Sequence, residues 1–319
     1  MADEVYDLII IGGGPGGLSA AVYAKRAALK TLLIEKGIPG GQVNLTDEVE
    51  NYLGFERISG AELSMRFADH AKSYGLEILN TEVKAVEPGR DRHVIRLADG
   101  SGLSTFAVIL ATGGSPRRLE VPGEDELYGK GVSYCATCDG FFFRNKTVLV
   151  VGGGDSAAEE ALYLAKLADK VYIAHRRDAL RASKILQQRI QDEGKIEVLW
   201  NTVVTEIKAD EQGVNAVTLK DVVSGEHRDL PVDGVFIFIG FTPNTKLVPE
   251  GVELAADGSV ITDDKCATGI AGIFAIGDLR KKFSRQIILS AADGCTAALA
   301  AALYVENKKG ASGKDACRV

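Results

Sequence analysis

The sequence predicts an α/β protein built from two Rossmann-like three-layer domains, one inserted into the other. Two glycine-rich motifs, at residues 12–17 and 152–157, each lie between an apolar strand and an apolar-faced helix. Breakers of regular structure at Ser115-Pro116 and at residues 241–244 suggest two short crossings between the domains. A chain of 319 residues has the usual length for two domains.

Composition narrows the class of protein. With 46% hydrophobic and 25% charged residues, the chain has the profile of a soluble globular protein. A net charge of −7 argues against nucleic acid or an anionic membrane as a main partner. The longest apolar runs, at 235–239 and 297–305, are expected to be too short to cross a bilayer.

Targeting signals and cysteine usage favour the cytoplasm. The acidic start, residues 1–4, does not resemble a signal peptide. Five widely spaced cysteines do not read as a secreted disulfide scaffold. In a reducing compartment, a Cys-x-x-Cys pair is more often catalytic or metal-binding than structural.

The first glycine motif carries a full set of nucleotide-binding signals. A strand at 5–11 precedes Gly12, Gly14 and Gly17, a helix is expected over 18–29, and a strand over 31–34 ends at Glu35. The glycines allow a tight turn and a close approach of the backbone to a pyrophosphate at the helix N-terminus. Glu35 stands where a carboxylate accepts hydrogen bonds from a ribose.

The second glycine motif differs at the ribose position. A strand at 147–151, a helix at 158–167 and a strand at 171–174 surround Gly152, Gly154 and Ala157. The place of the acid is taken by His175, and three arginines follow: Arg176, Arg177 and Arg181. Guanidinium groups bind a 2′-phosphate that an acid would repel, which favours NADPH over NADH. His175 is either a ligand contact or a surface residue.

A redox dithiol precedes the second motif. Cys135 and Cys138 can close and reopen a small disulfide, and each thiol favours the thiolate of the other. A zinc site is the competing interpretation, but no second Cys-x-x-Cys pair and no histidine motif accompany it. Asp139 can serve as the acid–base group, or it is a turn residue before Gly140.

Further segments bear on the site. Phe141, Phe142 and Phe143 are either core or a docking surface for a partner protein. Ala111, Thr112 and Gly113 end an apolar strand at 106–110 and allow a turn beside a ligand. A strand at 273–278 ends at Asp278, and a helix is expected over 288–305. Cys266, Cys295 and Cys317 are expected to be packing or surface residues, with Cys317 in a frayed tail.

The order of these motifs resembles one family. GGGPGG, ATGG, CATCDG, GGGDSA with HRR, and GIFAIGD follow one another as in the low-molecular-weight (bacterial and plant type) thioredoxin reductases of the pyridine nucleotide-disulfide oxidoreductase family. In glutathione-reductase-like relatives the redox cysteines follow the first glycine motif. Here residues 37–44 contain no cysteine, and the pair lies in the second dinucleotide domain.

The resemblance implies an FAD domain at 1–115 and 246–319 and an inserted NADPH domain at 116–245. It places thirteen residues around FAD: Gly12, Gly14, Pro15, Gly17, Glu35, Gln42, Asn51, Ala111, Thr112, Gly113, Asp278, Arg285 and Gln286. It places seven around NADPH: Gly154, Asp155, Ser156, His175, Arg176, Arg177 and Arg181.

The implied activity is the reduction of thioredoxin by NADPH through FAD. Cys138 corresponds to the thiol nearest the flavin, Cys135 to the thiol that attacks the substrate, and Asp139 to the acid–base group. The family also implies a cytoplasmic homodimer. Because dithiol and nicotinamide share one domain, we expect that domain to rotate between half-reactions. Residues 178–180 and 281–284 depart from the family pattern.

Other functions are compatible with parts of the sequence. Ferredoxin–NADP reductases lack the dithiol, ferredoxin-driven thioredoxin reductases lack an intact nucleotide site, and peroxiredoxin-reducing flavoproteins need a further domain. A glutaredoxin-like acceptor, or a non-enzymatic redox sensor that binds a nucleotide or zinc, is the remaining alternative.

Overall fold

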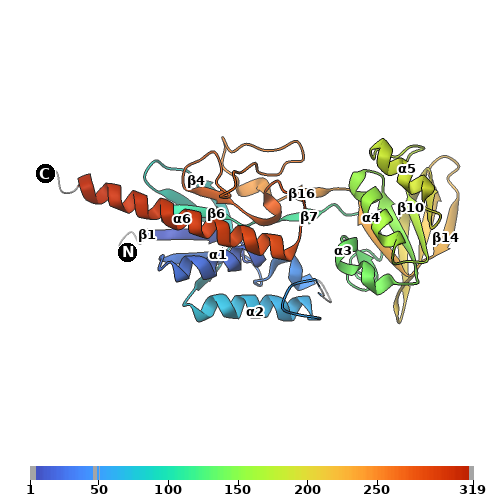
Figure 1. The fold of residues 1–319 in the computed structure, drawn as a ribbon, viewed down its shortest axis with the longest axis horizontal. Coiled ribbons are helices and arrows are strands. Elements are labelled where there is room, and N and C mark those ends of the chain that lie inside the picture. Colours follow the sequence, from blue (N-terminus) through green and yellow to red (C-terminus); the bar gives the residue numbers. More distant parts are fainter. Residues whose placement is uncertain (1–4, 46–48, 50, 316–319) are drawn as a thin grey trace. The chain divides into compact units, whose positions relative to one another are not determined.

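The computed structural model of the protein describes residues 5–45, 49 and 51–315, and its chain divides into two compact units (Figure 1). The first unit contains residues 5–45, 52–115 and 242–315. The second unit contains residues 116–241, with residues 49 and 51 grouped with it. The second unit is therefore an insertion within the first. The expectations for residues 1–4 and Cys317 lie outside the described residues.

The first unit is built on a seven-stranded sheet of order β3-β2-β1-β6-β5-β4, with β17 also paired to β6. Its strands are β1 (Val5–Ile11), β2 (Thr31–Glu35), β3 (Glu77–Asn80), β4 (Val83–Glu87), β5 (His93–Leu97), β6 (Gly102–Leu110) and β17 (Ile273–Ala275). On one side of β6, the first half pairs antiparallel with β5 and the second half pairs parallel with β17. The carboxyl ends of β1, β6 and β17 therefore meet at one edge.

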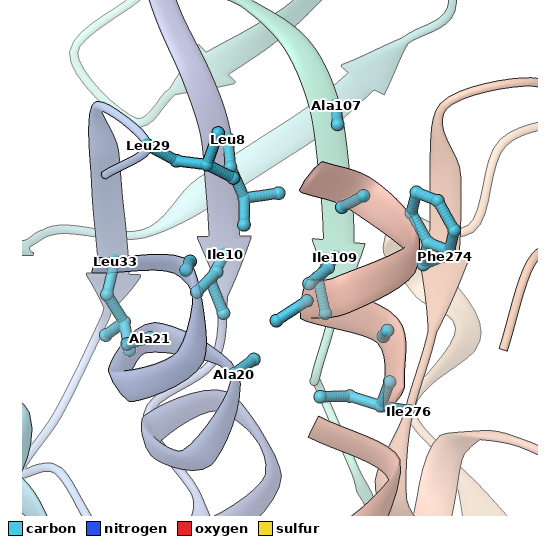
Figure 2. Close-up of a cluster of buried hydrophobic side chains, with 14 of the residues drawn as sticks. Leu8, Ile10, Ala20, Ala21, Leu29, Leu33, Ala107, Ile109, Phe274 and Ile276 are labelled. Carbon is cyan, nitrogen blue, oxygen red and sulfur yellow. The ribbon is translucent and has the colours of Figure 1, made fainter. Parts of the chain in front are cut away.

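Side chains alternate between two cores on the two faces of this sheet. Three helices cover one face: α1 (Pro15–Arg26), α2 (Gly60–Ser73) and α6 (Ile287–Asp315). Figure 2 shows their cluster, in which Leu8, Ile10 and Ile109 of the strands meet Ala20 and Ala21 of α1. The intervening strand residues, such as Ile9 and Leu110, face the second core, which residues 247–279 complete. This period-two alternation fixes the register of the strands.

Helix α6 is longer than the sequence predicted, and one earlier inference about it was wrong. It runs from Ile287 to Asp315 rather than over 288–305. Within it, Ile287–Gly310 is long and apolar enough to cross a membrane by length and composition, contrary to the expectation that every apolar run is too short. However, Ala297, Ala301 and Val305 are buried in the core of the first unit. A core helix of a soluble protein passes the same test.

The second unit has a five-stranded parallel sheet of order β11-β10-β9-β15-β8. Its strands are β8 (Val132–Ser133), β9 (Thr147–Gly152), β10 (Lys170–Ala174), β11 (Ile196–Leu199) and β15 (Gly234–Phe238). The cluster on one face joins α4 (Asp155–Ala165) and α5 (Lys184–Asp192) to the sheet. The cluster on the other face joins a three-stranded antiparallel sheet, made of β12 (Thr202–Asp210), β13 (Gly213–Asp221) and β14 (His227–Pro231).

The sequence predicted irregular breaks at the two crossings between the units. The structure has short strands there instead. β7 (Gly114–Pro116) and β16 (Phe241–Pro243) pair as a two-stranded sheet. A proline is tolerated at the end of such an edge strand because no ladder donor is required there. The remaining elements are the short helix α3 (Ala136–Asp139) and the 3-10 turns η1 (Gly41–Leu45), η2 (Gly140–Phe143), η3 (Thr245–Leu247) and η4 (Gly277–Leu279).

Candidate functional site

The first glycine loop leaves an open helix N-terminus. Gly12 follows β1 with φ of 108°, and a Cβ there would overlap the carbonyl oxygen of Ala111. Gly14 caps α1 without a side-chain hydrogen bond, Pro15 begins the helix, and a Cβ on Gly14 would meet nothing within 4 Å. The first-turn N–H groups of α1 therefore have no side-chain cap and can receive an anion.

Two further residues hold the loop in shape. A Cβ on Gly17 would overlap the carbonyl oxygen of Gly12, so the helix packs directly onto the turn. Glu35 ends β2, and its Oε2 accepts a hydrogen bond of 2.7 Å from the backbone nitrogen of Gly13. Its Oε1 accepts one of 2.8 Å from Gly37. Each carboxylate oxygen keeps a lone pair for a further donor.

The segment after β2 folds back on the same loop. The backbone nitrogen of Gly40 donates to the carbonyl oxygen of Gly13 at 2.7 Å. A Cβ on Gly41 would approach Cα of Gly14 at 3.3 Å. Gln42 follows in η1 and is exposed. Gln42 therefore follows directly on the segment that contacts the glycine loop, and its contact with FAD stays a prediction.

The carboxyl end of β6 is tied to the returning chain. The hydroxyl of Thr112 donates to the carbonyl oxygen of Asn244 at 2.8 Å, and the Asn244 side-chain amide donates to the carbonyl oxygen of Thr112 at 2.8 Å. The Asn244 backbone nitrogen also donates to Gly113 at 2.9 Å. Asn244 thus holds the Ala111–Thr112–Gly113 turn, a role that the sequence did not reveal.

Asp278 and Gln286, two further residues predicted around FAD, lie after β17 and before α6. Asp278 lies in η4 after β17, at the same sheet edge as Gly12 and Ala111. Burial raises the pKa of its carboxyl group, and the charges of Lys282 and Arg285 lower it. Gln286 immediately precedes α6, and its carbonyl oxygen accepts from the backbone nitrogen of Ser290.

Two predicted residues are engaged elsewhere. Arg285 makes a half-exposed ion pair with Asp257 at 3.8 Å. Asn51 is exposed, is grouped with the second unit by its contacts, and its side-chain amide donates a long hydrogen bond of 3.5 Å to the carbonyl oxygen of Thr137.

The second glycine loop has the same design. A Cβ on Gly152 would lie 2.6 Å from the carbonyl oxygen of Phe238 and 2.7 Å from Cβ of Ala157. Gly154 caps α4 without a side-chain hydrogen bond, and a Cβ there would meet nothing within 4 Å. Asp155 and Ser156 are exposed in the first turn. The N-terminus of α4 therefore also lacks a side-chain cap.

His175 is buried, which excludes the surface residue, one of the two alternatives that the sequence left open. It is 5% exposed, and its ring lies against Gly153, where a Cβ would overlap it. Its Nδ1 lies 2.9 Å from the carbonyl oxygen of Gly152, and its Nε2 lies 3.0 Å from that of Ala179. Because backbone carbonyls occupy both ring nitrogens, His175 connects the glycine loop to the arginine-bearing segment 176–181.

Other hydrogen bonds fix the arginine-bearing segment to the glycine loop. The backbone nitrogens of Arg181 and Ala182 donate to the carbonyl oxygen of Gly153 at 2.7 and 3.1 Å. Oδ1 of Asp155 accepts from the backbone nitrogen of Ser183 at 2.6 Å. Arg176, Arg177 and Arg181 are exposed. The segment that carries the three arginines is therefore held against the glycine loop that precedes α4.

Cys135 and Cys138 form a disulfide with an S–S distance of 2.06 Å. Cys135 is the N-cap of α3, and its Sγ lies 3.4 Å from Oγ1 of Thr137. The backbone nitrogens of Cys138 and Asp139 both donate to the carbonyl oxygen of Cys135. Both cysteines are partly exposed, so the pair is accessible to a reaction partner.

Ser133 connects Asp139 to the dithiol. Its hydroxyl donates to Oδ2 of Asp139 at 2.5 Å and accepts the backbone N–H of Cys135 at 3.0 Å. Nothing in the sequence marks this residue beyond its place two positions before Cys135. The serine holds the Asp139 carboxylate within the turn that carries the sulfurs.

Glu160 of α4 contacts the opposite side of the same turn. Burial raises the pKa of its carboxyl group, whereas hydrogen bonds from the backbone N–H groups of Ala136 and Thr137 lower it. Its Oε2 is buried and has no hydrogen-bond partner among the residues that the structure describes. No motif in the sequence identifies this carboxyl group.

The three phenylalanines after the dithiol divide into core and surface. Phe143 is 8% exposed and packs edge-on against Phe236, with ring centroids 5.1 Å apart. Phe141 is 51% exposed, and the guanidinium carbon of Arg144 lies 4.9 Å from its ring centroid. Phe143 is therefore a core residue, whereas the exposed ring of Phe141 keeps the docking surface as a prediction.

The isolated cysteines are placed as packing residues. Cys266 is buried, and burial raises the pKa of its thiol to about 11. Cys295 lies partly exposed on α6. Among residues 5–45, 49 and 51–315, no three His, Cys, Asp or Glu side chains are grouped to hold a metal ion.

Comparisons with known proteins agree with this geometry. A family model described as pyridine nucleotide-disulphide oxidoreductase matches residues 6–298. The thioredoxin reductase of Bacillus subtilis (strain 168) is 48% identical over 304 residues, which cover 95% of this chain and 96% of that protein. The thioredoxin reductase of Listeria innocua is 46% identical over 316 residues, 99% of each chain.

A solved structure matches the fold along the same length. The crystal structure of thioredoxin reductase from Streptococcus pyogenes MGAS5005 has a TM-score of 0.92 and 44% identity, and the match covers 96% of this chain and 100% of that one. The parallel strands β3-β2-β1-β6 of the first unit, the parallel sheet of the second unit and this match confirm the predicted α/β fold with two Rossmann-like domains.

Proposed function

Because the chain belongs to the pyridine nucleotide-disulphide oxidoreductase family, we propose that it is a thioredoxin-disulfide reductase that uses FAD and NADPH. Curated relatives with 46–48% identity over nearly the whole chain are named thioredoxin reductase. The observation that carries the proposal is the Cys135–Cys138 disulfide in the unit that holds the second glycine loop.

The first unit suits FAD. The open N-terminus of α1, with Gly12, Gly14, Pro15 and Gly17, would receive the pyrophosphate, and the free lone pairs of Glu35 would receive ribose hydroxyls. Asp278, at the end of β17, offers carboxylate oxygens to a polyol. Gln42, Asn51, Ala111, Thr112, Gly113, Arg285 and Gln286 complete the proposed FAD set.

The second unit suits NADPH. The open N-terminus of α4, with Gly154, Asp155 and Ser156, would bind the pyrophosphate. Arg176, Arg177 and Arg181 would bind the 2′-phosphate, and His175 would hold them in position. The proposed domains are thus an FAD domain at 1–115 and 246–319 and an NADPH domain at 116–245.

The dithiol would carry electrons to the protein substrate. When bound, the flavin would take a hydride from NADPH and supply two electrons to the disulfide. The Cys135 thiolate would then attack a sulfur of the thioredoxin disulfide and expel one substrate thiolate. Cys138 would attack Cys135, which re-forms the internal disulfide and releases the second thiolate. Asp139 would hold and transfer the protons, fixed by Ser133.

A movement of the second unit would let nicotinamide and dithiol act in turn. Each unit has its own hydrophobic cores, and the chain passes between them through β7 and β16. This organisation supports rotation of one unit on two short linkers. An engineered disulfide that clamps the units should leave cofactor binding intact and stop turnover, and undiminished turnover would refute the movement.

Assembly and location follow from the same family. We propose a cytoplasmic homodimer in which the exposed apolar side chains of α6, Leu299 at 50% and Leu303 at 61% exposure, contact a second copy. Sedimentation analysis should give twice the mass of the chain, and replacing both leucines by lysine should give monomers.

A flavin spectrum tests the proposed function. The purified protein should be yellow, NADPH should bleach it, and thioredoxin should restore the colour. The alternative substrate is a glutaredoxin-like acceptor. It is distinguished from thioredoxin by which of the two proteins restores the colour of the bleached flavin. Colourless protein that contains zinc would instead favour a non-enzymatic sensor.

A further inference from the structure

A cluster of four charged side chains joins the end of η4 to the second turn of α6. Oδ1 of Asp293 accepts from Nη1 of Arg280 at 2.8 Å, and its Oδ2 accepts from Nζ of Lys282 at 3.2 Å and from the backbone nitrogen of Gly277 at 3.0 Å. Lys282 also lies 3.7 Å from Oδ1 of Asp278.

Water has little access to this cluster. The side-chain exposure is 10% for Lys282, 12% for Asp293, 17% for Arg280 and 30% for Asp278. In such surroundings an unbalanced charge is costly, because few solvent dipoles compensate for it. Two cations face two carboxylates, so the cluster is neutral only while Asp278 is ionised.

Lys282 is the cation that reaches both carboxylates. Arg280 contacts Asp293, Thr262 and the carbonyl oxygen of Asp263, and no described contact joins it to Asp278. Burial raises the pKa of Asp278, and the opposing influences are Lys282, Arg285 and the Ser290 hydroxyl. Arg285 is 40% exposed and also pairs with Asp257, so its charge is better screened than that of Lys282.

We propose that Lys282 is a positioning residue of the flavin site, which keeps Asp278 ionised and its oxygens available as acceptors for the polyol hydroxyls. The inference deepens the proposed function and rests on it. A carboxylate offers only acceptors, whereas a protonated acid must donate one hydrogen bond. Of residues 281–284, where the sequence departs from the family pattern, Lys282 therefore contributes directly to this site.

Loss of Lys282 gives the cluster a net charge of −1. Asp278 then takes up a proton at a higher pH than in the parent protein, because one of its two nearby cations is gone. Besides Asp278 and Lys282, the charged or titratable groups in and around the cluster are Arg280, Arg285, Asp257, Asp263, Asp293 and Cys266. Flavin affinity should consequently depend on pH in the variant where it does not in the parent protein.

The experiment compares Lys282→Met with Lys281→Met. Lys281 is exposed and one position away, so its variant removes the same charge without touching the cluster. Holoenzyme is diluted between pH 6 and pH 8, and released flavin is measured by its fluorescence. For Lys282→Met, the dissociation constant should be higher at pH 6 than at pH 8, because the ionised fraction of Asp278 falls by up to tenfold for each pH unit below the pKa of its carboxyl group. Lys281→Met should match the parent protein.

Two further variants separate positioning from packing. Lys282→Arg retains the cation and should restore the flat profile. Asp278→Asn combined with Lys282→Met has no carboxyl group to titrate, so its weaker binding should not vary with pH. If Lys282→Met does not fold, Lys282→Gln serves for the same measurement.

Two results would overturn the proposal: a Lys282→Met profile identical to that of Lys281→Met, or an equal loss of affinity at every pH. The latter would mean that Lys282 only stabilises the start of α6. If the parent protein itself retains no flavin, the proposed function fails instead, so the two failures are distinguishable.

Discussion

The hydroxyl of Ser133 donates to Oδ2 of Asp139 at 2.5 Å while it accepts the backbone N–H of Cys135. One side chain therefore fixes both the proposed proton carrier and the backbone of the attacking cysteine. Ser133→Ala should slow thioredoxin reduction about tenfold, the kinetic equivalent of one typical hydrogen bond.

The measurement compares kcat of the variant with thioredoxin and kcat of the variant with ferricyanide. Ferricyanide takes electrons from the flavin directly. Only the thioredoxin rate should fall, and Ser133→Thr, which keeps a hydroxyl, should be close to the parent protein. An equal fall in both rates would contradict the assigned role.

Replacement of Cys138 by serine should abolish disulfide reduction. The variant cannot form the internal disulfide or resolve a mixed disulfide at Cys135. Bound flavin and its reduction by NADPH should persist, since no contact of the first glycine loop changes. The absorption spectrum and stopped-flow reduction by NADPH check this, and residual reduction of thioredoxin would refute the electron route.

Phe141 and Phe143 form a matched pair for the docking hypothesis. Phe141→Ala removes an exposed ring and should raise KM for thioredoxin without changing the rate with a small disulfide. Phe143→Ala creates a cavity beside Phe236 and should lower the stability of the second unit by about 3–5 kcal/mol. Steady-state kinetics and urea unfolding distinguish the two, and unchanged KM in Phe141→Ala would exclude this surface.

The arginines after β10 should determine cofactor preference. Arg176→Ala with Arg177→Ala should raise KM for NADPH by roughly 100-fold or more, since each of the two lost charge-assisted hydrogen bonds contributes about 1.5–3 kcal/mol. KM for NADH should change little. Arg189→Ala, on an exposed position of α5, is the control. Equal effects on both cofactors would mean that the 2′-phosphate binds elsewhere.

Glu160→Gln should stabilise the protein at neutral pH. Burial raises the pKa of the Glu160 carboxyl group above its value of 4.5 in the unfolded chain. Its contribution to stability is therefore fully present below pH 4.5 and is lost as pH rises through the folded pKa. The amide keeps the acceptor for Ala136 and Thr137 without ionising.

Urea midpoints at pH 4.5 and pH 7.5 test this. The urea midpoint of the variant should exceed that of the parent protein only at the higher pH. Glu159→Gln changes an exposed neighbouring position, so its urea midpoint should rise less than that of Glu160→Gln. A gain that is equal at both pH values would contradict the assignment.

Local signals predicted most of the fold, and long-range contacts account for what they missed. The glycine loops at residues 12–17 and 152–157 are contiguous and combine strand, turn and helix, so sequence identified them. The Cys135–Cys138 pair was equally local. The antiparallel strands β12–β14 were missed because no motif marks them, and α6 was shortened because small and polar residues interrupt its apolar pattern.

Site residues were missed for the same physical reason. Asn244 meets Thr112 across 132 positions, and Glu160 meets the dithiol turn from another helix. The position of His175 in the second glycine motif identified it as a candidate site residue. Its buried ring and two carbonyl partners, however, depend on the packing of Gly153. Such pairings are created by the tertiary fold and leave no spacing pattern in the chain.

Gly294 of α6 approaches α1 so closely that a Cβ would overlap the carbonyl oxygen of Gly16 and lie 2.8 Å from the backbone nitrogen of Ala20. The first glycine loop thus packs against a helix that is synthesised after the whole inserted unit. The inserted unit, complete at residue 241, can fold during synthesis, whereas the N-terminal unit must wait for β17 and α6. A nascent chain stalled before residue 273 should therefore contain a protease-resistant insert within a protease-sensitive frame.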